Sequence, residues 1–345
     1  MKYLQETRRV GSLWRAEAIL CLALAALLGC AGSARNDPPR PAPRPAHPEA
    51  TFSTHGIEVA GKTRAYRVYR PSEYEPGQAA VVVLHDGRQD MDSVLAEKTA
   101  TRRWVELAER DQFLLIVPNA YIRGRESGSG DEPRWNDLRR IGPGNEIDDV
   151  AFILAAVAEV QEREGFDRRK LYVAGASNGG MMTMRLLVDA PTAFAAAATF
   201  AASLPRGDVP RPSFGTPLMM LNGTVDPRVP WDGGSGTRPV EASVQFFVRA
   251  NGTDPAAFRE STLPDNQRDG CLVYSRVWSN PRGSAPAVVF FRVEGGGHSI
   301  PDPTPQGPLD DTGPQCRDVH GVDLAWHFLK RHRGRHSSSV VRSDR

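Results

Sequence analysis

Five short apolar runs constrain the fold of this 345-residue chain more than any other feature of its sequence. The runs "AAVVVLHD" (residues 79–86) and "FLLIVPN" (residues 113–119) are apolar at nearly every position, which is typical of strands covered on both faces. Similar runs follow at residues 170–177, 216–223 and 287–296. Because they alternate with helix-like stretches, the sequence predicts an α/β fold with a mostly parallel sheet and helices on both faces.

The stretches between those runs carry helical periodicity. Apolar residues recur at helical spacing in residues 93–111, 146–164, 239–252 and 321–332. Strict alternation in residues 61–71 predicts an antiparallel edge strand that ends at Pro71, and residues 194–203 indicate a further strand. No linker-like stretch interrupts residues 51–333, so we expect one domain there.

The N-terminus resembles an export signal. Basic residues precede the apolar run "AILCLALAALLG" (residues 18–29), which is too short to span a membrane. The run ends at Cys30, in a context that resembles a bacterial lipobox, where the cysteine is lipidated. A chance cysteine, or cleavage nearby without a lipid, is the alternative. We therefore expect residues 1–29 to be a signal peptide and the protein to be exported, either lipid-anchored to a bacterial membrane or secreted.

The segments on either side of the expected domain are polar. Residues 30–50 are rich in proline and have no apolar periodicity, which indicates an extended linker of roughly 3 Å per residue. Residues 334–345 are polar and basic and are expected to be a tail. The net charge is only +2 and both signs are interspersed, so nothing in the charge pattern argues for a nucleic-acid partner.

Cysteine usage agrees with export. Cys21 would leave with the signal and Cys30 would take the lipid, so that of the four cysteines only Cys271 and Cys316 remain in the domain. In an oxidising compartment two cysteines are expected to form a disulfide, although two free buried thiols are the alternative. A bridge here would constrain the segments on either side of His298.

The run at residues 170–177 ends in the pentapeptide GASNG, residues 175–179. In a G-x-S-x-G elbow the serine sits on a strained strand-to-helix turn, and the glycines avoid clashes that a Cβ would make with the neighbouring strand and helix. The bare pattern is weak, but a strand before it and a helix after it are what the mechanism requires. The sequence therefore predicts Ser177 as a nucleophile.

Two later strands end in candidate partners for Ser177. The run at residues 216–223 leads into a polar turn that contains Asp226, and the last run leads into three glycines and His298. Serine, aspartate, histidine is the chain order of an α/β-hydrolase triad, in which the histidine is the base and the aspartate orients it. The alternatives are that Asp226 merely caps its turn, with Asp232 as a competitor, and that His298 is an ordinary loop residue.

A serine nucleophile also needs donors for the developing oxyanion. The backbone N–H of Asn178 follows the nucleophile, and a second N–H is expected from Gly87 in the loop after the first buried strand. Asp86 complicates this loop, since it places a carboxylate near a site meant for an anion.

These motifs together resemble the esterase family of polyhydroxybutyrate depolymerases, which includes bacterial feruloyl and acetyl-xylan esterases and mycobacterial-type lipoproteins. The motifs in question are "LYVAGASNGGMM", "WND" with downstream "EIDDVAFI", "LNGTVDPRVPW" and "VEGGGHSIPD". The resemblance covers roughly residues 51–332. It implies an α/β-hydrolase fold, serine esterase activity without a cofactor, and Ser177, Asp226 and His298 as nucleophile, acid and base.

Two departures from the family concern the substrate side. The family usually has glycines directly after the histidine that corresponds to His85, whereas this chain has Asp86 there. The family also often has a cysteine before the Trp-Asn pair, whereas this chain has Arg134. Trp135 and Asn136 are expected to line an acyl or sugar pocket, with simple loop packing as the alternative. We expect no metal, because the remaining histidines lack ligand spacing with any partner.

The sequence thus favours an exported serine esterase that forms an acyl-enzyme. Polyhydroxyalkanoate-type esters, feruloyl or acetyl esters of polysaccharides, and small acyl esters are the substrate classes considered. A peptidase similar to prolyl oligopeptidase is less favoured, since no N-terminal propeller is present to gate peptides. A non-catalytic cell-surface binding protein on the same fold is the alternative from a different class, and Asp86 is the feature that favours it.

Overall fold

The computed structural model describes six stretches of the chain: residues 51–122, 133–139, 147–234, 236–279, 286–305 and 311–334. All of them belong to one compact unit, His47–Arg345. The expected signal peptide, Cys30, the linker and all but the first residue of the tail lie outside the described residues. In the part that is described, no helix is both long enough and apolar enough to cross a membrane.

The described residues form a sheet of ten strands in the order β1-β2-β4-β3-β5-β6-β7-β10-β9-β8. The six central strands, β4 to β10 in that order, pair in parallel, and β1, β2, β8 and β9 add antiparallel strands at the two edges. The predicted mostly parallel sheet is confirmed. The strands are β1 Thr51–Val59, β2 Lys62–Arg70, β3 Ala80–Leu84, β4 Leu114–Pro118, β5 Leu171–Ala176, β6 Ala196–Phe200, β7 Leu218–Gly223, β8 Phe258–Thr262, β9 Leu272–Ser279 and β10 Pro286–Glu294.

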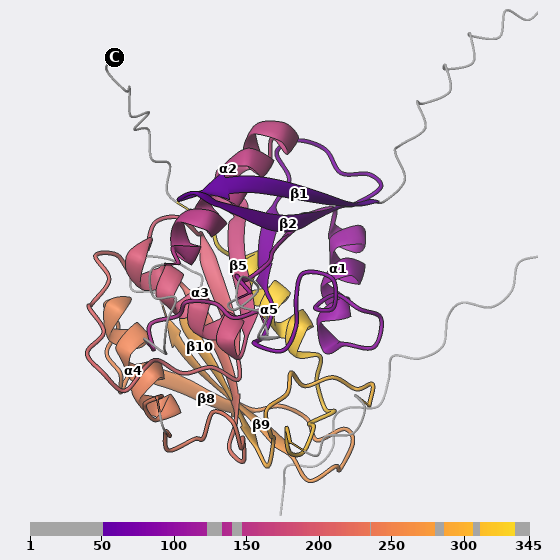
Figure 1. The fold of residues 1–345 in the computed structure, drawn as a ribbon. Coiled ribbons are helices and arrows are strands. Elements are labelled where there is room, and N and C mark those ends of the chain that lie inside the picture. Colours follow the sequence, from indigo (N-terminus) through magenta and orange to yellow (C-terminus); the bar gives the residue numbers. More distant parts are fainter. Residues whose placement is uncertain are drawn as a thin grey trace, which may run out of the picture. The chain divides into compact units, whose positions relative to one another are not determined.

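Helices cover both faces of the sheet (Figure 1). Side chains of α2, α3 and α4 pack in one apolar cluster, and those of α1 and α5 pack in a second cluster. Val82 of β3 belongs to the first cluster and Val81 to the second, which explains why the central strands are apolar at every position. The helices are α1 Arg103–Asp111, α2 Asp149–Glu164, α3 Asn178–Asp189, α4 Val240–Ala250 and α5 Gly321–Leu329, with short 3₁₀ turns at Ala100–Arg102 and Arg168–Lys170.

Three sequence-based expectations need correction. The alternating strand β2 is not at the edge, because β1 pairs along its outer side. The β8–β9 hairpin was not expected, since all five residues of β8 are exposed and show no apolar pattern. The helix expected at residues 93–111 begins only at Arg103. Thr99 and Thr101 donate side-chain hydrogen bonds to the carbonyl oxygen of Val94, which competes with helix formation there.

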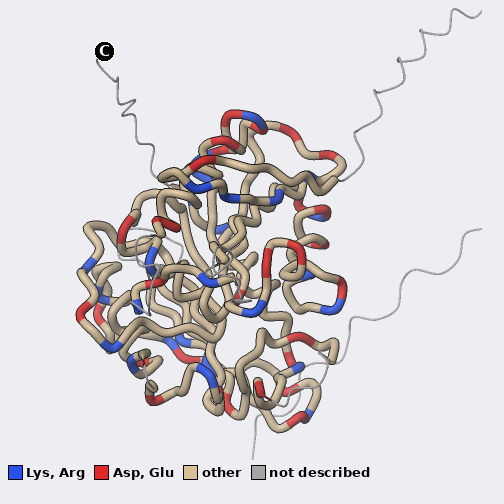
Figure 2. The backbone as a smooth tube through the Cα atoms, viewed as in Figure 1, with Lys and Arg blue, Asp and Glu red and all other residues tan. Residues whose placement is uncertain are grey.

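Basic and acidic residues are both spread along most of the described chain (Figure 2). Basic and acidic residues alternate over the helices and the edge hairpins, and many form ion pairs such as Arg103 with Asp323 and Arg276 with Glu260. This arrangement agrees with the mixed charge pattern of the sequence.

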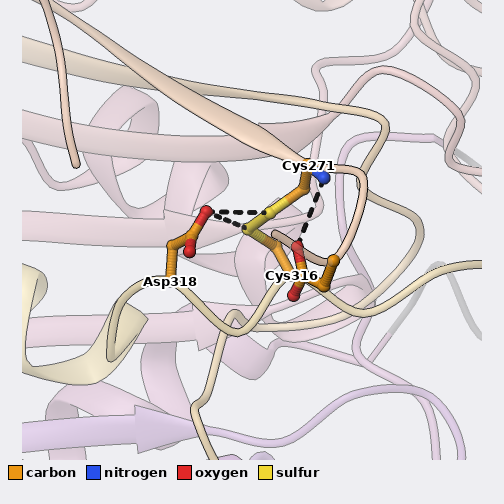
Figure 3. Close-up of side chains that lie close together, drawn as sticks. Cys271, Cys316 and Asp318 are labelled. Atoms are coloured by element: carbon orange, nitrogen blue, oxygen red, sulfur yellow. Dashed lines mark hydrogen bonds between the residues drawn. A yellow bond between two sulfur atoms is a disulfide. The ribbon is translucent and has the colours of Figure 1, made fainter. Parts of the chain in front are cut away.

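Cys271 and Cys316 form a disulfide with their Cα atoms 5.6 Å apart (Figure 3). The carboxylates of Asp269 and Asp318 flank the bridge, and Oδ2 of Asp318 lies 3.4 Å from the sulfur of Cys271. Two cysteines and two aspartates in this arrangement could hold a metal ion if both sulfurs were thiolates. In the disulfide the two sulfurs are bonded to each other, so neither is available as a thiolate ligand.

Removing the bridge should lower the stability of the domain. The disulfide closes a loop of 45 residues, so the double variant Cys271→Ser, Cys316→Ser should lose about 2–4 kcal/mol in the free energy of unfolding. Urea unfolding of the oxidised wild type, the reduced wild type and the variant measures this. If reduction left the unfolding midpoint unchanged, the bridge would have no stabilising role.

Candidate active site

The turn between β5 and α3 holds Ser177 in a strained backbone conformation. Its φ of 51° and ψ of −119° lie where residues with a side chain are rarely found. A Cβ on Gly175 would lie 2.3 Å from the carbonyl oxygen of Gly179, and one on Gly179 would lie 2.3 Å from that of Leu84. Both glycines are therefore needed for α3 to approach β3 and β5 this closely, as the sequence pattern predicts.

Three side chains beyond the carboxyl ends of β5, β7 and β10 form one line of hydrogen bonds. Nε2 of His298 lies 2.9 Å from the hydroxyl oxygen of Ser177, and Nδ1 lies 2.8 Å from Oδ2 of Asp226. An ionised carboxylate can only accept, so Nδ1 carries the proton and Nε2 accepts from the serine hydroxyl. The structure thus brings together the three residues that the sequence predicts to act together.

The turn around Asp226 orients its carboxylate. Oδ1 accepts hydrogen bonds from the backbone N–H groups of Arg228 and Val229, both at 2.8 Å. Oδ2 is thereby left to face His298. Capping the turn and orienting the histidine are therefore not alternatives, because one carboxylate does both. Asp232, the competing candidate, is exposed, whereas Asp226 is buried.

A neighbouring loop supports the backbone around His298. The N–H of His298 donates to the carbonyl oxygen of Thr312 at 2.5 Å, and the N–H of Gly297 donates to that of Pro314 at 2.7 Å. A Cβ on Gly297 would lie 2.2 Å from the Thr312 oxygen, so this approach also requires glycine. The supporting loop runs on to Cys316, and the disulfide therefore fixes the segment that holds the histidine.

Two backbone N–H groups, those of Asn178 and Gly87, lie near the serine. Asn178 is the first residue of α3, where an N–H has no partner within the helix. Gly87 lies beside it, since a Cβ on Gly87 would be 3.6 Å from the Cβ of Asn178. Among the described residues, neither N–H donates a hydrogen bond. The two residues that the sequence predicts as oxyanion donors thus lie side by side next to Ser177.

His85 fixes the direction of the Gly87 N–H. Its Nε2 accepts from the N–H of Ala120 at 3.0 Å, so the proton is on Nδ1, which donates to the carbonyl oxygen of Asp86 at 2.7 Å. In a trans peptide the N–H points away from the carbonyl, so this bond holds the Gly87 N–H on the opposite side. Burial lowers the pKa of His85, which keeps the ring neutral. The sequence analysis assigned no role to this residue.

Trp135 and Asn136 lie behind the site rather than in its cavity, which corrects the expectation that they line a substrate pocket. They are 2% and 6% exposed, and neither lines the cavity beside Ser177. The indole of Trp135 donates to the carbonyl oxygen of His85 at 2.9 Å, and its backbone N–H donates to the side chain of Asn178 at 2.8 Å. These residues therefore hold the two segments that supply the backbone donors.

Asn136 connects that segment to a buried ion pair. Its N–H donates to Oδ2 of Asp149 at 2.6 Å, and Oδ1 of the same carboxylate accepts from Arg64 at 2.6 Å. The side chains of Arg64 and Asp149 are 4% and 0% exposed. Asp149 lies in the first turn of α2, and its neighbour Asp148 caps the helix by accepting from the N–H of Ala151.

A cavity of about 190 Å³ opens beside Ser177 and His298. Much of its wall consists of small side chains, including Ala100, Ala176 and Ala201, and the loop after β3 contributes Asp86. Ala201 has a φ of 48°, so two strained non-glycine residues, Ala201 and Ser177, line the same cavity. Strain of this kind is concentrated at functional sites.

Breaking the buried ion pair should be far more costly than breaking an exposed one. Arg64→Met leaves Asp149 buried without a counter-charge and should lower the free energy of unfolding by about 3–5 kcal/mol. The control Arg67→Met removes an exposed pair with Asp92 and should cost no more than about 1 kcal/mol. Urea unfolding of both variants tests this, and equal small losses would show that the buried pair does not support the segment.

Comparisons with known proteins agree with this fold. The model of the prolyl oligopeptidase family matches residues 120–205, the part that contains the serine elbow. The protein named "Putative esterase NocK" from Nocardia uniformis subsp. tsuyamanensis is 32% identical over 351 residues, covering 89% of this chain and 96% of that relative.

Two solved structures share the fold at low identity. An acetyl xylan esterase from Aspergillus awamori has a TM-score of 0.52 and 16% identity, covering 81% of this chain and 99% of its own. A thermostable esterase has a TM-score of 0.51 and 16% identity over 82% of this chain, which spans 63% of that structure. With the full-length relative and these folds in agreement, the chain belongs to the esterase family of the α/β-hydrolases.

Proposed function

We propose that this protein is a serine esterase that hydrolyses carboxylic esters through an acyl-enzyme. The observation that carries the proposal is the hydrogen-bonded line from Asp226 through His298 to Ser177, next to two backbone N–H groups without a partner in the described structure. Membership of an esterase family supports the class of reaction, and the geometry supports the assignment of roles.

The geometry suits both half-reactions. His298 Nε2 takes the proton of Ser177 as the hydroxyl oxygen attacks the ester carbonyl, and Asp226 stabilises the imidazolium that forms. The N–H groups of Asn178 and Gly87 donate to the oxyanion of the tetrahedral intermediate. His298 then returns the proton to the departing alcohol. Water, activated by the same imidazole, releases the acid from the serine. No step in this scheme calls for a cofactor.

The cavity favours a small acyl group. Its volume of about 190 Å³ is below the roughly 300–1,000 Å³ of sites that enclose drug-sized ligands. Acetyl and other short acyl esters therefore fit the proposal best, and the similar fold of an acetyl xylan esterase agrees with this choice. Polyhydroxyalkanoate-type and feruloyl esters are the other substrate classes, and their larger acyl portions fit this cavity less well.

The two alternative functions are less well supported. The prolyl oligopeptidase model matches only residues 120–205, whereas the relative that matches 89% of the chain carries the name of an esterase, so a peptidase is not favoured. A non-catalytic binding protein has no use for a strained serine within hydrogen-bonding distance of a histidine. Export through residues 1–29 and lipidation of Cys30 stay proposals that rest on the sequence alone.

Ser177→Ala should abolish the hydrolysis of p-nitrophenyl acetate and p-nitrophenyl butyrate while the circular dichroism spectrum stays that of the wild type. A fluorophosphonate probe should label the wild type and not the variant. A wild-type domain with neither turnover nor labelling would refute the esterase and favour the binding protein.

His85→Ala should lower kcat for p-nitrophenyl acetate on the order of tenfold to a hundredfold with little change in KM, because the Gly87 N–H is no longer aimed at the transition state. His85→Asn can still donate to the carbonyl of Asp86 and should recover part of the loss. A rise in KM alone, with kcat unchanged, would argue that His85 does not act on the oxyanion donor.

A further inference from the structure

Asp86 is the one carboxylate among the residues that line the cavity beside Ser177. Apart from His298, the other described lining residues are apolar, hydroxyl or amide side chains. Asp86 stands in the loop after β3, directly before Gly87, so its charge belongs to the segment that supplies an oxyanion donor. Position 86 is also one of the two positions at which the sequence departs from the family that it resembles.

The carboxylate of Asp86 is held by a hydrogen bond and forms no ion pair among the described residues, although Cζ of Arg134 would lie 3.9 Å from a Cβ on the next residue, Gly87. Its Oδ1 accepts from the backbone N–H of Arg88 at 2.7 Å. The guanidinium of Arg88 instead donates to Asp311 at 2.5 Å, and Asp311 also pairs with Arg228. No ion pair in the described part of the chain includes Asp86. The hydrogen bond fixes the direction of the side chain and leaves Oδ2 open to a ligand.

An open carboxylate here has a consequence for the chemistry. The acyl-transfer transition state places negative charge on the substrate oxygen, and a fixed anion in the same cavity opposes that charge. A positive group on the substrate, close to the scissile bond, attracts the Asp86 carboxylate and reduces the repulsion between that carboxylate and the oxyanion. An ester that carries a carboxylate is repelled by Asp86 when it binds. The repulsion increases when the oxyanion forms in the transition state.

We propose that Asp86 is a specificity-determining residue that selects esters carrying a positive charge near the scissile bond, in the acyl or the alcohol portion. The inference rests on the proposed esterase function and deepens it, since it names the charge of the preferred substrate. It also gives the unusual Asp86 a role that is compatible with catalysis rather than opposed to it.

Matched ester pairs test the selection. Acetylcholine and 3,3-dimethylbutyl acetate have the same shape and differ by one positive charge in the alcohol portion. The p-nitrophenyl esters of 4-(trimethylammonio)butyrate and 5,5-dimethylhexanoate place the same difference in the acyl portion. For at least one pair, wild-type kcat/KM should favour the cationic ester about twofold to fivefold, as expected of one partly solvated ion pair, and the preference should shrink with added salt.

The variant Asp86→Asn keeps an oxygen that accepts from Arg88 and removes only the charge, so the ratio of cationic to neutral kcat/KM should fall to about one. Asp92→Asn is the control: Asp92 is a carboxylate of the same loop, 66% exposed, paired with Arg67 and outside the cavity. In Asp92→Asn the ratio of cationic to neutral kcat/KM should equal that of the wild type.

The outcomes separate the two proposals. Turnover of p-nitrophenyl acetate without a cationic preference in either pair, or with a preference that persists in Asp86→Asn, would overturn the selection by Asp86 and leave the esterase intact. Absence of turnover of every ester, together with absence of fluorophosphonate labelling, would overturn the esterase and this inference with it. A preference that is lost in Asp86→Asn and kept in Asp92→Asn would establish the selection.

Discussion

The close contact between α3 and the strands beneath it is the constraint on which the site depends. Gly179 of the helix meets the backbone at the end of β3, and Gly175 of β5 meets the helix in turn. This contact holds Ser177 in a conformation that costs on the order of 1–3 kcal/mol by itself. The surrounding sheet and its two apolar clusters supply the stability that maintains it. The serine hydroxyl and the Asn178 amide therefore need no rearrangement to act.

Buried hydrogen bonds provide a second level of support for the candidate site. The segments that contain Gly87 and Asn178 are held by hydrogen bonds of His85 and Trp135. The neighbouring Asn136 is in turn anchored by the buried Arg64–Asp149 ion pair. The network contains a buried charge pair, which is costly to form and still more costly to disrupt. It therefore favours one arrangement of the loops over looser alternatives.

The sequence was sufficient for those features that follow from local pattern. Continuous apolar runs identify strands covered on both faces, and the glycines around Ser177 identify the elbow. Asp226 and His298 could be predicted because each directly follows a buried strand. Trp135 could not, because a side chain next to a motif can point into a cavity or into the core, and only its contacts with His85 and Asn178 decide. The support of His298 by Thr312 likewise depends on a pairing that no local pattern encodes.

The order of the strands along the chain has a consequence for synthesis on the ribosome. β10 lies between β7 and β9, although β7 precedes it by more than sixty residues of sequence. Until β10 and the segment after it have emerged, one edge of β7 stays unpaired in the nascent chain and the candidate site lacks His298. The exposed edge of β7 is a surface that a chaperone would have to shield in the meantime.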